Sequence, residues 1–390
     1  MKKKRRKNKT IKYRRNEQNT QSTIDIPNFD NKFAPINDSI DPSTSKKSKG
    51  KLALKIILII LSCFILFTII VGLTFYFFME NKLNKINYVG LTSDQIEINN
   101  GVSNNLSSYR NIALLGLDTR EDSYTGCRSD GIMIISINEK THDVKITSVY
   151  RDTYLDLRKN NTDNIYLDKI THAYAFGNAQ QTLSSLNRNL DLNITEFVAV
   201  NFSSVVEIVD SVGGIDMNIT SEEVKYINSY INAIEKNTGK SSSHITTPGM
   251  HHLDGVQALA YCRIRYTDGG DFKRTERMRD VLVATFEKAK NMNPVQINKL
   301  ADTVLPHIST NIQKNKIYDA ISQMFSYHVN ESAGWPYNVK GSTMNGVWYG
   351  VPTNLEQDVS QLYYNLFGIE NYEPSQTVKD ISNEIINRTN

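Results

Sequence analysis

The sequence predicts an α/β protein, a three-layer α/β/α sandwich carried behind a single N-terminal transmembrane helix. Short apolar runs typical of buried strands alternate with longer segments of helical periodicity from about residue 109 onward. A separate stretch at 56–79 is apolar throughout, which no helix of a soluble core requires. The length of 390 residues leaves room for one large domain, or two ordinary ones, beside such an anchor.

Positive charge is concentrated at the beginning of the chain. The whole chain has 45 Lys and Arg against 41 Asp and Glu, a net charge of +4. Residues 1–55 hold 16 Lys or Arg and five Asp or Glu, a balance of +11, which leaves −7 for the rest. We expect 1–55 to be a basic, disordered cytoplasmic tail, because it is rich in Asn, Ser and Thr. The acidic remainder argues against nucleic acid as a partner.

Residues 56–79 read IILIILSCFILFTIIVGLTFYFFM, with no charged residue between Lys55 and Glu80. At 1.5 Å per residue this helix reaches about 36 Å, enough for a hydrocarbon core of about 30 Å. The run is too long for a signal peptide and no A-x-A site follows it, so we expect an uncleaved membrane anchor. The basic residues before it predict a single-pass protein of the cell membrane, with a cytoplasmic N-terminus and an extracellular domain.

The rest of the chain divides into three parts: a polar extracellular stalk at 80–108, an α/β domain at 109–370 and a polar C-terminal tail at 371–390. Within the domain, continuous apolar runs predict buried strands; they lie at 112–117, 131–137, 144–149 and 197–200. Helical spacing predicts helices between them; these span 172–190, 203–212, 254–261 and 271–290, the last with Asp271 as its N-cap.

Charged side chains follow where the predicted elements end. Asp118 and Arg120 come after the first strand, Arg128 and Asp130 precede the second, and Arg151-Asp152 follows the third. The segment Tyr261–Arg265 presents Arg263 and Arg265 at strand spacing, and the last helix adds Arg274 and Arg277 on one face. Ligands gather outside the carboxyl ends of strands in α/β sheets, so these side chains are candidates for one site.

Their chemistry favours a pyrophosphate held by a divalent cation. The planar guanidinium of arginine suits bidentate phosphate binding. Aspartates without a Cys or His pattern favour a hard cation, Mg²⁺ or Mn²⁺. The alternative is that each neighbouring Arg–Asp pair is an ordinary salt bridge or helix cap.

The chain resembles the LytR-CpsA-Psr family of membrane-anchored cell-wall glycopolymer ligases. Seven segments occur in the family's order over residues 109–370; they are NIALLGLDTR, CRSDGIMIISIN, ITSVYRDTYLDL, DKITHAYAFG, FVAVNFSSVVEIVDSVGGIDM, LDGVQALAYCRIRY and GDFKRTERMRDVL. The resemblance implies the family's α/β/α sandwich. It also implies a transferase that moves an anionic glycopolymer, such as teichoic acid or capsule, from a polyprenyl (pyro)phosphate carrier in the membrane lipid onto peptidoglycan.

The resemblance also implies roles for individual residues. Asp118 and Asp130 match the Mg²⁺ ligands, and Asp271 is the candidate to activate the acceptor hydroxyl. Seven arginines match phosphate-binding positions, with Arg128, Arg151, Arg265 and Arg274 also expected to be catalytic; the remaining three are Arg120, Arg263 and Arg277. Asp152 fits an ion-pair role. The sequence departs from the family pattern at Tyr150, where Pro is usual, and at Met278, where Gln is usual.

Two cysteines flank arginines that are expected to converge, Cys127 beside Arg128 and Cys262 beside Arg263. Because thiols can oxidise outside the cell, we hypothesise a disulfide between them; the alternative is two small buried apolar side chains.

Two other functions remain open at the level of sequence. A lipid-pyrophosphate hydrolase would need the same Asp, Arg and Mg²⁺ set with water as acceptor. A non-enzymatic envelope regulator or polymer-binding scaffold would also carry an anion site behind an anchor.

Overall fold

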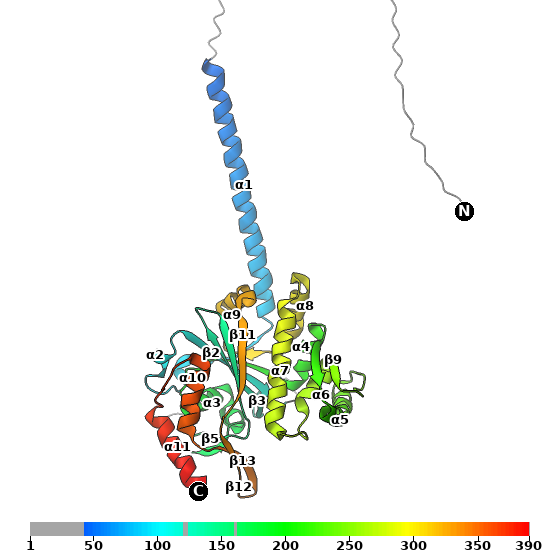
Figure 1. The fold of residues 1–390 in the computed structure, drawn as a ribbon. Helices are drawn as coiled ribbons and strands as arrows, with labels where there is room; N and C mark the ends of the chain where they lie inside the picture. The colour runs from blue at the N-terminus through cyan, green and yellow to red at the C-terminus, as the bar shows by residue number, and fades with distance from the viewer. Residues whose placement is uncertain (1–42, 120–123, 160–161, 390) are drawn as a thin grey trace, which may run out of the picture. The chain divides into compact units, whose positions relative to one another are not determined.

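The computed structural model describes residues 43–119, 124–159 and 162–389, and divides the chain into two compact units, 1–70 and 71–390. Helix α1 (Ser43–Leu83) begins in the first unit and ends in the second (Figure 1). Within it, Leu54–Leu83 is long and apolar enough to cross a membrane by length and composition. This confirms an apolar spanning helix where the sequence predicts one, whereas helix α1 already starts inside the segment predicted to be a disordered tail.

A seven-stranded mixed sheet forms the middle layer of the second unit, in the order β1-β10-β7-β2-β3-β4-β11. Its strands are β1 (Asn87–Tyr88), β2 (Tyr109–Leu117), β3 (Ser129–Asn138), β4 (Asp143–Val149), β7 (Glu196–Asn201), β10 (Ser309–Thr310) and β11 (His328–Trp335). Strand β3 runs antiparallel to both β2 and β4, while β7 runs parallel to β2. The ends of β2 and β4 and the start of β3 therefore share one edge of the sheet.

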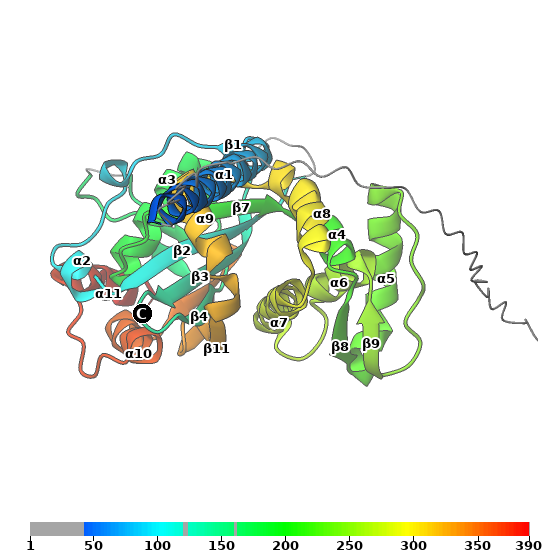
Figure 2. The same cartoon turned by 90° about the horizontal axis from the view of Figure 1, so that it is seen from above.

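Helices cover both faces of this sheet, which confirms the predicted α/β/α sandwich (Figure 2). On one face pack α3 (His172–Leu190), α10 (Leu355–Phe367) and α11 (Gln376–Thr389). On the other face pack α4 (Phe202–Ser211), α6 (Gly255–Arg263) and α7 (Gly270–Lys290), and α5 (Ser221–Thr238) packs against α6. Alternate residues of the central strands supply the two cores: Leu115 and Ile134 belong to the first, Leu114 and Met133 to the second.

Smaller elements complete the second unit. Helices α2 (Val102–Asn105), α8 (Pro294–Val304) and α9 (Lys314–Ser322) are short, as are the 3-10 turns η1 (Ser93–Gln95), η2 (Leu305–His307) and η3 (Met324–Ser326). Three two-stranded sheets pair β5 (Tyr154–Asp156) with β6 (Leu167–Lys169), β8 (Ile215–Ile219) with β9 (Gly249–Leu253), and β12 (Val339–Met344) with β13 (Val347–Pro352).

Close packing of α6 on α4 depends on one glycine. A Cβ added to Gly255 would lie 2.0 Å from the backbone oxygen of Val206, so no larger residue fits there without moving a helix. Asp254 caps α6 by accepting a hydrogen bond from Gln257 N at 2.9 Å. These two residues set the position of α6, whose last turn contributes to the site described below.

Both ends of the predicted catalytic domain differ from expectation. In the expected stalk at 80–108, Ile96, Val102 and Leu106 are buried in the main core. In the expected polar tail at 371–390, helix α11 buries Val378, Ile381 and Ile385 against the same core. The buried residues of α11 are spaced three and four apart among polar ones. They form a narrow apolar stripe, which the overall polar composition of the segment conceals.

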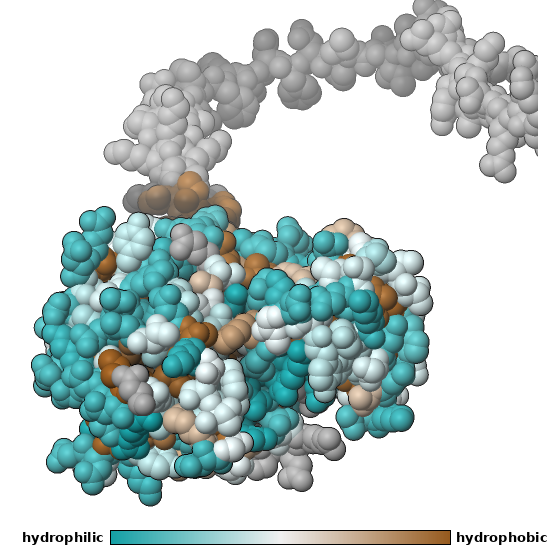
Figure 3. Space-filling model, turned by 60° about the horizontal axis from the view of Figure 1, so that its bottom comes forward, coloured by the Kyte–Doolittle hydropathy of each residue, from teal (hydrophilic) through white to brown (hydrophobic). Residues whose placement is uncertain are grey.

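Figure 3 shows a predominantly hydrophilic face on which hydrophobic side chains form small, separate patches. The large apolar side chains of the two cores are buried, which leaves mainly polar side chains on this face.

Candidate active site

One cavity of about 440 Å³ collects the predicted charged residues at the shared edge of the sheet. Asp118 follows β2, Asp130 is the second residue of β3, and Arg151 follows β4. Seven of the predicted site residues line this cavity: Asp118, Arg128, Asp130, Arg151, Arg263, Arg265 and Arg274. The antiparallel pairing of β2, β3 and β4 brings the first four together, because it places their polar ends side by side.

Helices supply the opposite wall of the cavity. Arg263 is the last residue of α6, Arg265 follows the helix C-cap Ile264, and Arg274 projects from α7. The expectation of strand spacing for Arg263 and Arg265 was therefore wrong, although both reach the cavity. A helix end followed by an extended residue can direct both side chains to one side, as two strand residues would.

Asp130 lies at the centre of the charged groups and is 8% exposed. Its Oδ2 accepts a hydrogen bond from Arg151 Nη1 at 2.5 Å and lies 3.6 Å from Arg265 Nη2 and 3.9 Å from Arg274 Nη1. Its Oδ1 is buried without a hydrogen-bond partner among the described residues. Burial raises the pKa of Asp130, and Asp118 adds to the rise, while Arg151 opposes it. A free lone pair on a buried carboxylate marks a position for a cation or a donor from a ligand.

Asp271 lies in the first turn of α7, where Gly269 is the N-cap in place of the predicted Asp271. Its Oδ1 is 3.3 Å from Arg274 Nε and 3.8 Å from Arg265 Nε. Burial raises its pKa to about 6, although Arg151 and Arg265 favour the charged form. A carboxylate with this pKa can accept a proton near neutral pH, which suits a general base.

Arg277 lies outside the cavity, which corrects the prediction that it joins the phosphate-binding arginines. Its Nε donates to Glu223 Oε1 at 2.7 Å, its Nη1 to the backbone oxygen of Ile264 at 3.1 Å, and its Nη2 to Thr267 Oγ1 at 2.6 Å. The side chain is 1% exposed. Positions i and i+3 are about 60° apart around a helix, so Arg274 faces the sheet edge while Arg277 faces α5.

Two more predicted site residues, Arg120 and Asp152, are not among the described residues that line the cavity. Arg120 lies outside the described residues. Asp152 has the ion-pair role that the resemblance implies, with its Oδ1 3.5 Å from Arg151 Nε and 3.0 Å from Lys169 Nζ. Asp152 therefore helps to hold Arg151 at the cavity wall.

The hypothesis of a disulfide between Cys127 and Cys262 was wrong. The described residues include all three cysteines, and each is a free thiol. Cys127 packs against the core on one face of the sheet, whereas Cys262 belongs to the core on the other face. Neighbouring arginines converge because their side chains are long, but the cysteines beside them point into different layers.

The described residues contain no cluster of three His, Cys, Asp or Glu that could hold a metal ion without a ligand's help. Asp118 and Asp130 nevertheless line the same cavity, and the free Oδ1 of Asp130 is available. Protein sites commonly hold Mg²⁺ with one or two carboxylates, the other ligands being water and substrate phosphate oxygens. These two residues fit that kind of site.

An apolar cavity of about 160 Å³ adjoins the charged one and was missed from the sequence. The two cavities share Leu259 and Met278 in their walls. The apolar walls come from the strands β2, β3 and β7 and from helices α4, α6 and α7. Met278 stands where the family usually has Gln, and its apolar side chain belongs to the boundary between the two cavities. An apolar run on a strand looks the same whether it faces a core or a cavity, so the apolar cavity could not be predicted from the sequence.

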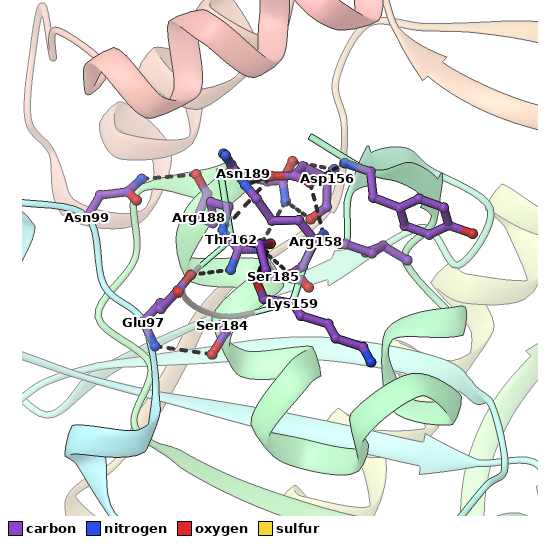
Figure 4. Close-up of polar contacts among 12 residues, drawn as sticks. Glu97, Asn99, Asp156, Arg158, Lys159, Thr162, Ser184, Ser185, Arg188 and Asn189 are labelled. Atoms are coloured by element: carbon purple, nitrogen blue, oxygen red, sulfur yellow. Dashed lines mark hydrogen bonds and ion pairs between the residues drawn. The ribbon is translucent and has the colours of Figure 1, made fainter. Parts of the chain in front are cut away.

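A second cluster of buried charged groups is structural (Figure 4). Arg188 pairs with Glu97, and its Nη1 donates to the backbone oxygen of Arg158 at 3.1 Å. Asp156, which is fully buried, accepts from Arg158 Nε at 2.6 Å and from the backbone nitrogen of Tyr166 at 3.0 Å. The chain itself satisfies these groups, so the cluster ties the segment around Glu97 to α3 and fixes the loop that carries Tyr166.

Fold and site together define a class of protein: an α/β/α sandwich behind a helix long and apolar enough to cross a membrane, with an arginine-lined cavity at one sheet edge. The model of the LytR_cpsA_psr family matches residues 73–364, and the chain belongs to this family.

Similar proteins with curated names are teichoic acid transferases. A polyisoprenyl-teichoic acid–peptidoglycan teichoic acid transferase, TagU, from Bacillus cereus is 29% identical over 289 residues, 73% of this chain and 88% of that protein. The TagU protein of Enterococcus faecalis is 28% identical over 279 residues, 71% of this chain and 83% of that protein.

Solved structures share the fold. A Streptococcus agalactiae protein, gbs0355, superposes with a TM-score of 0.56 at 26% identity, covering 68% of this chain and 90% of that one. A structure of TagT bound to LIIa-WTA superposes with a TM-score of 0.54 at 24% identity, covering 73% of this chain and all of that one.

Proposed function

We propose that this protein transfers an anionic glycopolymer from a polyprenyl pyrophosphate carrier onto peptidoglycan. The observation that carries the proposal is the pair of adjoining cavities, one lined by five arginines and the other apolar, with Leu259 and Met278 in both walls. A lipid pyrophosphate has this combination of a charged headgroup and a greasy tail. The TagU relatives, which match most of their length, are named for this reaction. A TagT structure of the same fold is described with a bound octaprenyl pyrophosphate lipid.

In the proposed reaction, an acceptor hydroxyl attacks the phosphorus that carries the polymer. The new bond joins the acceptor oxygen to phosphorus, and the bond between that phosphorus and the oxygen of the polyprenyl phosphate breaks. The hydroxyl proton passes to Asp271, and polyprenyl phosphate leaves as an anion. No nucleotide is needed, because the pyrophosphate donor is already activated.

The arginines stabilise the charge that develops during this step. Arg151, Arg265 and Arg274 already surround one carboxylate oxygen at 2.5, 3.6 and 3.9 Å, so their positive ends converge on one place. Groups that are positioned before the reaction stabilise a transition state without reorganising. Asp130 holds Arg151 and Asp152 supports it from the other side.

Asp118 and Asp130 would hold a magnesium or manganese ion, which neutralises charge on the pyrophosphate when bound. Three arginines around the buried Asp130 keep its carboxylate in place. Its Oδ1, which has no hydrogen-bond partner among the described residues, supports the additional role of metal ligand.

We also propose that the tail before α1 is cytoplasmic and that residues from about 80 onward lie outside the cell. The excess of +11 charges in residues 1–55 supports this orientation. The site then faces the peptidoglycan, and the lipid carrier reaches it from the same membrane.

The test uses the full chain in lipid nanodiscs with a polyprenyl-pyrophosphate-linked polymer and peptidoglycan. Polymer joined to peptidoglycan, together with released polyprenyl phosphate, is the expected product. Arg265→Ala should abolish it, and Glu276→Gln, at a half-buried α7 residue outside the cavity, should not. Carrier phosphate release without joined polymer would indicate the hydrolase, and an Arg265→Ala variant that complements a deletion strain would indicate a scaffold.

A further inference from the structure

Two exposed and two half-buried aromatic side chains form a group that contacts connect to Arg151 of the charged cavity. Tyr166 precedes β6 and is 51% exposed, and Phe176 on α3 is 49% exposed. Their ring centroids are 6.1 Å apart, and His172 lies 6.0 Å from Phe176. Tyr349 on β13 is half-buried and packs at 4.9 Å against Tyr154. We call Tyr166, His172, Phe176 and Tyr349 the aromatic surface.

A chain of contacts connects this surface to the charged cavity. Arg151 in the cavity wall pairs with Asp152, which lies 3.0 Å from Lys169 Nζ. The Lys169 ammonium lies 5.4 Å from the centre of the Tyr349 ring. The backbone nitrogen of Gly350, next to Tyr349, donates to the backbone oxygen of Asp152 at 2.9 Å. These contacts therefore link Tyr349, one member of the aromatic surface, to Arg151 through Asp152 and Lys169.

The candidate base is on the same flank. Asp271 is held among the arginines of the cavity, with its Oδ1 3.3 Å from Arg274 Nε and 3.8 Å from Arg265 Nε. The ring of Phe272, next to Asp271, packs at 4.4 Å against Tyr150, next to Arg151. An acceptor molecule could bring its hydroxyl to Asp271 from the side of Asp152. The rest of that molecule would then lie over Lys169 and the aromatic surface.

The charged side chains among these rings are already paired. Lys169 pairs with Asp152, and His172 Nδ1 lies 2.8 Å from Asp168 Oδ2. Tyr349 also interacts with the Asp168 carboxylate through its hydroxyl. The surface thus offers flat amphipathic rings and little net charge. Such rings pack well on the C–H faces of neutral sugars, whereas an anionic polymer is drawn to the arginines.

We propose that the aromatic surface of Tyr166, His172, Phe176 and Tyr349 binds the sugar rings of the acceptor glycan strand and directs its hydroxyl toward Asp271. This inference rests on the proposed function for the identity of the acceptor. Asp156, which accepts from the backbone nitrogen of Tyr166, holds one end of the surface in place. Tyr166, His172, Phe176 and Tyr349 act as substrate-positioning residues, and none of them takes part in the chemical step.

The test compares Tyr166→Ala and Phe176→Ala with the control Tyr364→Ala, an exposed tyrosine on α10 that is 57% exposed. Full-length protein in nanodiscs is assayed with lipid-linked polymer and soluble, uncrosslinked peptidoglycan oligomers. We expect each surface variant to raise the acceptor KM by about fivefold, as the loss of one ring contact implies, with an unchanged donor KM. Tyr364→Ala should change neither. An unchanged acceptor KM, or a raised donor KM alone, would overturn the proposal.

Binding is measured separately, so that a failure of the proposed function is distinguishable. The same oligomers are titrated into wild-type and variant protein by calorimetry, without any donor. Weaker binding by Tyr166→Ala and Phe176→Ala supports the aromatic surface even if no transfer occurs. Equal binding by all variants, or no binding by the wild type at millimolar oligomer, rules it out.

Discussion

Arg151 Nη1 donates to Asp130 Oδ2 at 2.5 Å, while Oδ1 of the same carboxylate is buried without a partner among the described residues. One oxygen of Asp130 therefore organises the arginines and the other remains available to a ligand. Asp130 therefore has two roles in the site, because it holds Arg151 in place and keeps one oxygen for a ligand.

Asp130→Asn should lower transfer activity by about 100-fold to 1,000-fold, as expected when one preorganised charged group is lost from an active site. The variant should also bind Mn²⁺, used as a paramagnetic probe with a soluble pyrophosphate, more weakly than the wild type. Activity assays and electron paramagnetic resonance check the two effects. Wild-type metal binding in the variant would show that Asp130 is not a ligand.

Arg265 and Arg277 should respond in opposite ways to substitution. Arg265 has a side chain that is 47% exposed, so Arg265→Ala should abolish transfer and change the free energy of unfolding by less than about 0.5 kcal/mol. Arg277→Met should destabilise the protein by about 3–5 kcal/mol, because it leaves the Glu223 carboxylate buried without its partner. Denaturant unfolding in detergent measures both. A fully stable Arg277→Met variant would refute the structural assignment.

The pH dependence of transfer should follow Asp271. Its pKa is raised to about 6, mainly by burial, so the base is protonated below that pH and the rate should fall. The rate should rise through pH 6 and level off above it, and Asp271→Asn should be nearly inactive at every pH. Because the folded pKa lies above the unfolded one, ionisation of Asp271 lowers the free energy of unfolding as pH rises through 6. Asp271→Asn should lack that decrease, which thermal melts at pH 5 and pH 8 would reveal.

Thiol counting should find three free cysteines per chain in denaturant, with and without reductant. In the folded protein, burial raises the pKa of Cys262 to about 12, so a maleimide should label it only after unfolding. Intact mass before and after labelling provides the measurement. A loss of two thiols without reductant would restore the disulfide hypothesis.

Helix α11 should be required for stability. Ile381 is fully buried, and Ile381→Ala should cost about 2–5 kcal/mol of unfolding free energy. Ile386 lies on the same helix and is 37% exposed, so Ile386→Ala serves as the matched control with a much smaller effect. Equal effects of the two substitutions in a thermal melt would mean that α11 does not pack on the core.

Sequence by itself determined the class of fold, the apolar span and most of the site. The strands at 112–117 and 131–137 could be predicted because a strand buried on both faces needs a continuous apolar run, and the span because lipid excludes charge. Arg151 and Arg274 could be proposed because long charged side chains at element ends reach a common point even when the details of the backbone are unknown, and Asp118 because it directly follows a predicted strand.

Tertiary structure decided what depends on the direction of short or fully buried side chains. Arg274 and Arg277 look equivalent in sequence. They project from α7 in different directions, so Arg274 lines the cavity and Arg277 pairs with Glu223. Cys127 and Cys262 lie on different faces of the sheet, and their short side chains cannot reach across it to form a disulfide. The aromatic surface joins residues from β13, α3 and the loop before β6, and only the packing of distant segments brings those rings together.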